Sequence, residues 1–200
     1  EQLSVSARET KIHLAIAVWD WPKYFDEEKF ARGIRLCWAK YRRPPANSAP
    51  TAAKAVGLYM ICTVSKNAAE RDGYEDALML DTEGNIAETT GANIFFIRDG
   101  VLHTPIADRF LDGITRRTII AMARARGLEV IDRRISPLEL DTFSECFVVG
   151  TAAEVTPVGE IAEHRFTPGP ITFGLADGYA ALVRGEPPAK AHQTIRTVTV

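Results

Sequence analysis

The stretch that decides the fold is residues 73–105, GYEDALMLDTEGNIAETTGANIFFIRDGVLHTP. It alternates short apolar runs with turn-forming residues, a pattern typical of consecutive β-strands. Strands are predicted at 77–81 and at 93–98, and a turn precedes Ile86. The dipeptide Asp99-Gly100 favours a two-residue hairpin turn into a further strand at 101–104. The segment therefore indicates a sheet that contains at least one antiparallel hairpin.

Helices and further strands flank this segment on both sides. Strands are predicted at 12–21 and 33–42, where β-branched and aromatic residues gather or alternate. A helix is predicted after Thr51 through a run of helix formers, with Lys54 in its first turns. Further predicted elements are a helix at 115–127, a strand at 128–135, a short helix at 137–143, a strand at 146–150 and a helix at 170–184.

This order of mixed strands and helices predicts an α/β or α+β domain rather than a doubly wound sheet. We expect this domain to span residues 1–185, followed by a C-terminal tail at 186–200. The chain begins with Glu1 and enters an apolar run almost at once, so we also expect it to be part of a longer protein.

Composition and charge weigh against several classes of function. The 24 Lys and Arg nearly balance the 26 Asp and Glu, which gives no support to a nucleic-acid or acidic-membrane partner. No apolar run is long enough to cross a bilayer. Cys37, Cys62 and Cys146 are widely separated and lack metal-ligand spacing, so we expect no disulfide framework, no metal site and a cytoplasmic location.

Two charged residues stand among small and apolar neighbours. Desolvation of Lys54 in TAAKAVGLY would lower the pKa of its amine and make it a nucleophile for carbonyl carbon. Glu88 in NIAETTGAN lies just past a predicted strand, and if buried it would need a cationic partner such as a protonated pyridine nitrogen. Position alone favours simpler interpretations, namely a lysine that reaches solvent and a solvated turn residue.

Two turns of small residues are candidate anion sites. Gly113-Ile114-Thr115 opens a predicted helix, and Gly150-Thr151-Ala152 follows an apolar strand. Backbone N–H groups at such positions, together with a threonine hydroxyl, bind anions readily. Either turn is also compatible with simple helix capping or chain reversal. The sequence has neither GxGxxG nor GxxxxGK[ST], so a dinucleotide or P-loop site has no support.

Four stretches, taken together and in order, resemble the class IV aminotransferases, the pyridoxal-phosphate enzymes of fold type IV, and most closely the branched-chain amino acid aminotransferases. They are RRPPANSAPTAAKAVGLY, GYEDALMLDTEGNIAETTGANIFFIRDGVLHTP, FLDGITRRTI and ECFVVGTAAEVTPV. This resemblance implies a large C-terminal domain built as an α/β pseudo-barrel with pyridoxal 5'-phosphate in its mouth. The family's small N-terminal domain, which brings an arginine for the phosphate, has no counterpart among these residues.

The resemblance implies three contacts with the cofactor ring. Lys54 would be the Schiff-base lysine and would move the proton between the substrate α-carbon and C4′ of the cofactor. Tyr59 would hydrogen-bond the phenolic oxygen of the cofactor. Glu88, which follows Lys54 at the spacing of the family, would keep the pyridine nitrogen protonated so that the ring can act as an electron sink.

The resemblance also implies contacts with the phosphate and with the substrate. Ile114 and Thr115 would bind the phosphate from one side and Thr151 from the other. The backbone amides of Ala152 and Ala153 would receive the substrate α-carboxylate.

The activity implied is the transfer of an amino group between a branched-chain L-amino acid and 2-oxoglutarate, in two ping-pong half-reactions within at least a homodimer. Two departures bear on the substrate: Ala92 stands where branched-chain enzymes commonly carry a second acid, and Leu58 where many carry Asn. A D-amino acid aminotransferase or an aminodeoxychorismate lyase of the same fold are alternatives. A catalytically silent domain that serves as an assembly surface is the alternative outside enzymology.

Overall fold

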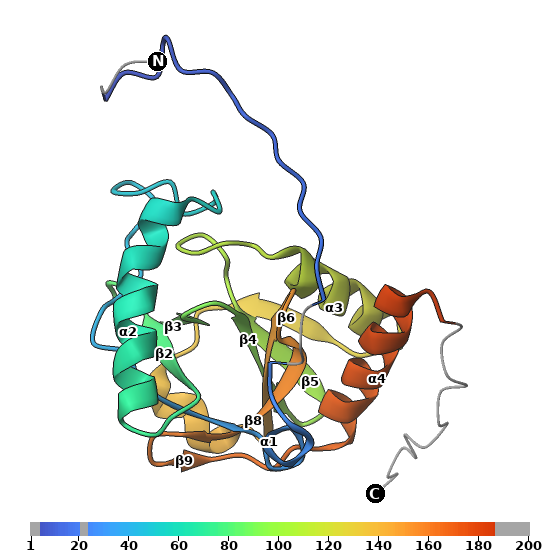
Figure 1. Cartoon of the computed structure of the whole chain (residues 1–200). Helices are drawn as coiled ribbons and strands as arrows, with labels where there is room; N and C mark the ends of the chain where they lie inside the picture. Colours follow the sequence, from blue (N-terminus) through green and yellow to red (C-terminus); the bar gives the residue numbers. More distant parts are fainter. Residues whose placement is uncertain (1–4, 21–23, 187–200) are drawn as a thin grey trace, which may run out of the picture.

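A curled nine-stranded sheet forms the centre of residues 5–20 and 24–186, the part of the chain that the computed structural model describes (Figure 1). Its strands are β1 (Ile34–Trp38), β2 (Asp76–Leu80), β3 (Ile86–Thr89), β4 (Asn93–Arg98), β5 (Val101–Pro105), β6 (Val130–Arg133), β7 (Glu145–Gly150), β8 (Glu154–Ile161) and β9 (His164–Arg165). Their order is β3-β2-β1-β8-β7-β4-β5-β6, and β9 pairs with β8.

The sheet is mixed and closes partly on itself. Strand β1 runs parallel to both of its neighbours, β2 and β8, whereas β7 is antiparallel to both β4 and β8. The amide of Ile86 in β3, the first strand of the order, donates to the carbonyl of Ile135, which follows the last strand β6, at 2.8 Å. This arrangement confirms the predicted mixed α/β class and the pseudo-barrel that the resemblance implies.

Helices cover the sheet on opposite sides. Helix α2 (Tyr59–Arg71) lies on one side in Figure 1, and α3 (Ile114–Ala125) and α4 (Pro170–Arg184) lie together on the other. The remaining helical segments are α1 (Glu27–Arg32) and the 3-10 turns η1 (Val56–Leu58) and η2 (Pro137–Thr142). None of the helices in the described ranges is both long and apolar enough to serve as a membrane span.

Both faces of the central strands are buried. Ile94 and Phe96 of β4 belong to a core cluster on one face of the sheet, while Phe95 packs in a second cluster with α3 and α4. The rings of Phe95 and Phe147 stack with centroids 5.0 Å apart. Burial on both faces explains why NIFFIR is a continuous apolar run, although an antiparallel strand with one solvated face would alternate.

The hairpin and most C-terminal elements lie where the sequence predicts them. Strands β4 and β5 pair antiparallel with Arg98 opposite Val101, and the intervening Asp99 and Gly100 have φ of 53° and 77°. Positive φ at both central residues is the geometry that Asp-Gly favours in a two-residue hairpin. Helix α1 and strands β3, β8 and β9 were not predicted. Pro157 and Gly159 interrupt the apolar pattern of β8, which hides this strand in the sequence.

Three predictions for the N-terminal half of the chain are wrong. Residues 12–20 are extended and exposed, with no strand pairing, and residue 21 lies outside the described range. The helix expected after Thr51 starts later because Thr51 and Ala53 donate to carbonyls in tight turns and Ala55 is extended, so Lys54 precedes η1. Glu88 lies within β3, a strand that was not predicted, and not just past a strand. The predicted tail boundary is untested, since residues 187–200 lie outside the described range.

Candidate functional site

Three chain reversals meet at one end of β3, β4 and β7. Asn93, the first residue of β4, pairs with Val149 near the end of β7, so the turn at 90–92 lies beside the turn at 150–153. A Cβ atom on Gly150 would lie 3.5 Å from the carbonyl oxygen of Gly91. The third reversal precedes α3, where the amide of Gly113 donates to Asn93 Oδ1 at 3.3 Å. The pairing of β4 with β7 and the Asn93 side chain therefore bring the three chain reversals together.

Glu88 is a buried carboxylate at this end of the sheet, with only 8% of its surface exposed. Its Oε1 lies 3.3 Å from Nε of Arg43, and its Oε2 accepts a hydrogen bond from Asn93 Nδ2 at 3.2 Å. The pKa of Glu88 is raised to about 8, chiefly by burial, while Arg43 opposes this shift and nearby Asp76 adds to it. A second cationic partner would favour the charged form of this carboxylate.

Arg43 is a buried arginine that the sequence did not single out. Its backbone follows β1, where its amide donates to the carbonyl of Leu80 at 2.8 Å, and its Nη1 donates to Sγ of Cys62 at 3.3 Å. The Nε of Arg43 is buried and has no hydrogen-bond acceptor in good geometry among the described residues. The signal was present in RRPPAN, but two adjacent arginines before a loop usually indicate a solvated surface.

Tyr59 begins α2 and is half-buried. Burial raises the pKa of its phenol, and the negative charge of Glu88 raises it further, which places the two side chains within electrostatic range. The cofactor contacts that the resemblance implies for Tyr59 and Glu88 stay predictions.

Lys54 is not brought to these residues. It is exposed, between a bend and η1, and no hydrogen bond or ion pair joins it to another described residue. Its neighbours Ala53 and Val56 are exposed as well, so the small apolar residues around it do not desolvate the amine in this structure.

The turn before α3 has the features of an anion site. Gly113 is the N-cap of α3 and no side chain caps this helix. The first N–H groups of such a helix, with its positive dipole end, favour an anion. Ile114 is 75% exposed, whereas Thr115 is buried with its hydroxyl 3.2 Å from that of Tyr179. Thr151 is exposed at the neighbouring turn.

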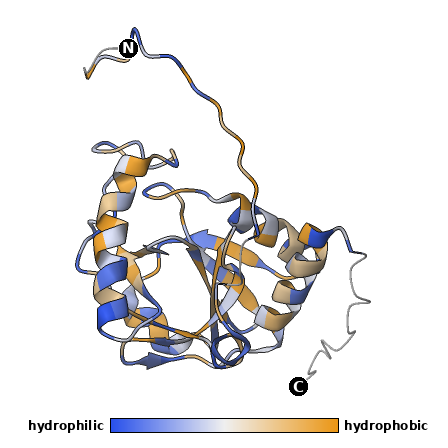
Figure 2. Cartoon of the chain, viewed as in Figure 1, coloured by the Kyte–Doolittle hydropathy of each residue, from blue (hydrophilic) through white to orange (hydrophobic). Residues whose placement is uncertain are grey.

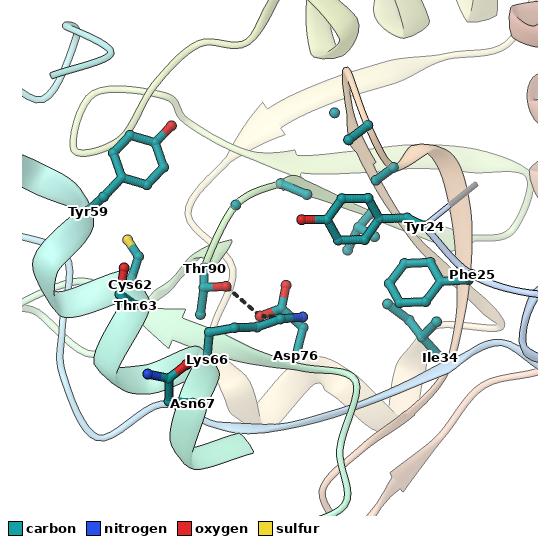
Figure 3. Close-up of a pocket in the computed structure, with 16 residues that line it drawn as sticks. Tyr24, Phe25, Ile34, Tyr59, Cys62, Thr63, Lys66, Asn67, Asp76 and Thr90 are labelled. Carbon is teal, nitrogen blue, oxygen red and sulfur yellow. Dashed lines mark hydrogen bonds and ion pairs between the residues drawn. The ribbon is translucent and has the colours of Figure 1, made fainter. Parts of the chain in front are cut away.

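A cavity of about 300 Å³ opens beside these turns (Figure 3). It is lined by three of the predicted site residues, Tyr59, Ala152 and Ala153, whereas the other predicted residues do not line it. Tyr24 and Tyr59 stand on opposite sides of it in Figure 3. Phe25, Ile34 and Val148 form an apolar part of the remaining wall.

The floor of the cavity is polar, and sequence reasoning missed it. Thr90 Oγ1 donates to Asp76 Oδ1 at 2.6 Å, and Lys66 Nζ lies 4.0 Å from the same oxygen. Tyr24 was missed also. Asp76 and Lys66 come from β2 and α2, which lie close only in the folded chain, so no local pattern could have joined them.

Residues 1–161 match the amino-transferase class IV family. The chain belongs to this family. Over 201 aligned positions, this class IV aminotransferase chain is 37% identical to the branched-chain-amino-acid aminotransferase of Pseudomonas aeruginosa, covering 99% of the chain and 65% of that relative.

Solved structures agree with this assignment. The branched-chain aminotransferase of Thermoproteus uzoniensis with norvaline superposes with a TM-score of 0.80 at 38% identity, covering 85% of this chain and 56% of that one. The branched-chain amino acid aminotransferase of Escherichia coli gives a TM-score of 0.79 at 36% identity, with 86% and 58% covered. A further branched-chain amino acid aminotransferase, solved with pyridoxamine 5'-phosphate, gives a TM-score of 0.80 at 39% identity, with 85% and 57% covered. The class IV aminotransferase chain thus spans between about half and two-thirds of the length of these relatives.

Proposed function

We propose that this chain is the cofactor-binding domain of a pyridoxal-phosphate-dependent aminotransferase that acts on branched-chain L-amino acids. The observation that carries the proposal is Glu88, a buried carboxylate whose pKa stays raised to about 8 despite the neighbouring Arg43, at the position of the family's pyridine-binding acid. The names of the relatives support the substrate class, and the related structure with pyridoxamine 5'-phosphate supports the cofactor.

The chemistry of the site fits this cofactor. When bound, pyridoxal phosphate supplies an electron-withdrawing ring that stabilises negative charge at the substrate α-carbon. Glu88 holds a proton on the pyridine nitrogen, which provides the cation that its burial requires. Tyr59 donates to the phenolic oxygen. The uncapped start of α3 at Ile114 and Thr115, with Thr151 from the neighbouring turn, binds the phosphate.

Lys54 would supply the amine that binds the cofactor covalently and would carry the proton that leaves the substrate α-carbon. The TAAKAVGLY stretch supports this role, as does the spacing to Glu88. The exposed amine has no ion pair among the described residues, so no existing interaction has to break when it engages the cofactor.

The cavity supports an apolar substrate side chain. Phe25, Ile34 and Val148 provide apolar wall, and the turn at Ala152 and Ala153 offers backbone amides for the α-carboxylate. An apolar pocket separates substrates that differ by one methylene by only about 1–3 kcal/mol. We therefore expect activity on leucine, isoleucine and valine within that range, with 2-oxoglutarate as amino acceptor in a ping-pong cycle, and poor activity on alanine and D-amino acids.

The assembly and location follow the same proposal. Apolar residues are prominent in the upper half of α2 in Figure 2. Two apolar side chains of this helix reach solvent, since Met60 is 69% exposed and Val64 is 49% exposed. An exposed apolar strip of this kind supports association into a homodimer or larger oligomer. Three free cysteines support a reducing cytoplasm.

The test is a half-reaction assay. Pyridoxal phosphate is added to the protein, its long-wavelength absorbance is recorded, and single amino acids are then added. Loss of this absorbance with leucine, isoleucine and valine is the expected result. A preference for D-alanine over L-leucine would assign a D-amino acid aminotransferase instead, and turnover of aminodeoxychorismate would assign the lyase. A protein that takes up no pyridoxal phosphate would be the catalytically silent domain.

A further inference from the structure

Asn93 lies between the two ends of the proposed cofactor site. Its Nδ2 donates both to Glu88 Oε2 at 3.2 Å and to the carbonyl of Leu111 at 2.9 Å. Its Oδ1 accepts from the amide of Gly113 at 3.3 Å. One buried carboxamide, 5% exposed, therefore contacts the carboxylate at one end and the turn that starts α3 at the other.

The contacts of Asn93 use the particular chemistry of a carboxamide. An amide nitrogen offers two donors, and both are engaged, while the amide oxygen offers an acceptor. A carboxylate of the same shape would provide no donor and would repel Glu88. The backbone of Asn93 is held in turn by its pairing with Val149, so the side chain has a fixed base.

Position 113 requires glycine because it lies so close to the Asn93 amide that a side chain would not fit, and not because of its backbone angles. Its φ of −63° is accessible to any L-residue. However, a Cβ atom there would lie 2.6 Å from Asn93 Oδ1, which is closer than van der Waals contact permits. A methyl group at this position would therefore push on the amide from the α3 side without touching Glu88.

We infer that Asn93 is a positioning residue that couples the turn at 111–113 to Glu88, so that the phosphate end and the pyridine end of the site are held in register by one amide. The reference to a cofactor rests on the proposed function. The coupling itself is a property of the protein without cofactor, so it can be tested separately.

The test measures the titration of the Glu88 carboxyl by carbon-13 NMR in the protein without cofactor. The Glu88 resonance is assigned by its loss in Glu88→Gln. In the Gly113→Ala variant, the displaced amide should lose its bond to Glu88, and the titration midpoint should move upward by about one pH unit, as for loss of a hydrogen bond to a charged group. The control is Gly91→Ala, which is nearer to Glu88 in sequence but whose Cβ meets nothing within 4 Å.

A second variant tests the same coupling from the amide itself. Asn93→Asp removes both donors and places an acid beside Glu88, so the Glu88 midpoint should rise by more than in Gly113→Ala. Asn85→Asp is the matched control, since the Asn85 amide donates to Asp81 at 3.4 Å, outside the site. Arg43 and Asp76, which act on the pKa of Glu88, are unchanged in all four variants, as are Tyr59 and Cys62, whose pKa values Glu88 raises.

The outcomes separate this inference from the proposed function. If the Glu88 titration midpoint is the same in Gly113→Ala as in Gly91→Ala, the coupling is refuted. This conclusion holds whether or not pyridoxal phosphate binds. If Gly113→Ala moves the titration and the protein takes up no pyridoxal phosphate, the coupling stands and the proposed function fails. Should Asn93→Asp not fold, the comparison of the two glycine variants still decides.

Discussion

The two residues central to the proposed chemistry, Glu88 and Lys54, lie in regions that are built very differently. Glu88 stands in β3, is buried, and has each carboxyl oxygen held by a different side chain, those of Arg43 and Asn93. Lys54 is exposed, between a bend and η1, and makes no hydrogen bond or ion pair to the described residues. The pyridine end of the site is thus organised by the sheet itself, whereas the lysine is not fixed by the contacts of this chain.

This difference separates preorganisation from chemical reactivity. A carboxylate fixed by strand register, one ion pair and one hydrogen bond requires no rearrangement when a cation arrives, and such preorganisation is a main source of electrostatic catalysis. An exposed lysine outside regular structure must be ordered when it engages its partner, which costs conformational entropy. Substitutions at the two positions should therefore differ in their effects on activity, affinity and stability.

The largest expected effect comes from Lys54→Ala, which should abolish turnover because it removes the amine that binds the cofactor. The thermal unfolding temperature should not change, since the exposed side chain contributes no packing. Borohydride reduction and peptide mapping of the parent should find the pyridoxyl label on Lys54. Lys40→Ala, at another exposed lysine, is the control; a label on Lys40 or Lys66 would end the assignment.

Glu88→Gln comes next and should lower the rate by about a hundredfold or more while cofactor remains bound, as for removal of one preorganised electrostatic partner. The reason is that a neutral amide cannot stabilise a protonated pyridine nitrogen. The rate of the leucine half-reaction at saturating cofactor measures it. Glu83→Gln, in an exposed turn beside Arg109, should keep the parent rate. Near-parent turnover in Glu88→Gln would show that another group holds the nitrogen.

The same contrast explains what the sequence could predict. Strands β2, β4 and β5 were located because their apolar runs and the Asp99-Gly100 turn are local signals, whereas β3, which carries Glu88, was not. The start of the helix after Lys54 was misplaced because helix formers continue through residues 52–58, while the tight turns and the extended Ala55 that delay the helix carry no local signal. Residues 12–20 have strand composition but no neighbouring strand to pair with among the described residues.

The supporting residues of the site were not predictable for a related reason. Arg43 and Asn93 reach Glu88 from the end of β1 and the start of β4, and Tyr24 and Asp76 meet only around the cavity. These are long-range consequences of sheet curvature and register. Motif spacing predicts which residues share a function, but it cannot predict which side chains hold those residues in place.

A smaller effect is expected at the phosphate end. Thr115→Val and Thr151→Val each remove one hydroxyl bond to a charged group, about 1.5–3 kcal/mol, which corresponds to about 10–150-fold weaker affinity for pyridoxal phosphate. The rate at saturating cofactor should change little, because neither hydroxyl transfers a proton. Equilibrium titration followed by absorbance measures the affinity. Thr118→Val, one turn further along α3, should bind as tightly as the parent; equal binding by all three variants would place the phosphate elsewhere.

The last prediction concerns stability rather than activity or affinity, and it comes from Glu88 without cofactor. The pKa of Glu88 is raised by burial from its ordinary 4.5 to about 8, so between these pH values the folded protein holds a proton that the unfolded chain has released. The free energy of unfolding should therefore fall as pH rises through this window, by at most about 1.4 kcal/mol per pH unit from this one group. In Glu88→Gln, the part of this pH dependence that comes from residue 88 should disappear.

The measurement is urea unfolding of the parent and Glu88→Gln at pH 5, 6, 7 and 8. At each pH the free energy of unfolding of Glu88→Gln is subtracted from that of the parent. The pKa of His103 is lowered chiefly by burial, so this residue makes the free energy of unfolding rise with pH. Both proteins contain His103, so its contribution cancels in the subtraction. Glu75 and Glu139 have lowered pKa values and lose their contribution only in more acidic solution. A difference that is flat from pH 5 to 8 would mean that Arg43 keeps Glu88 charged throughout, and the carboxylate would then need no second cation.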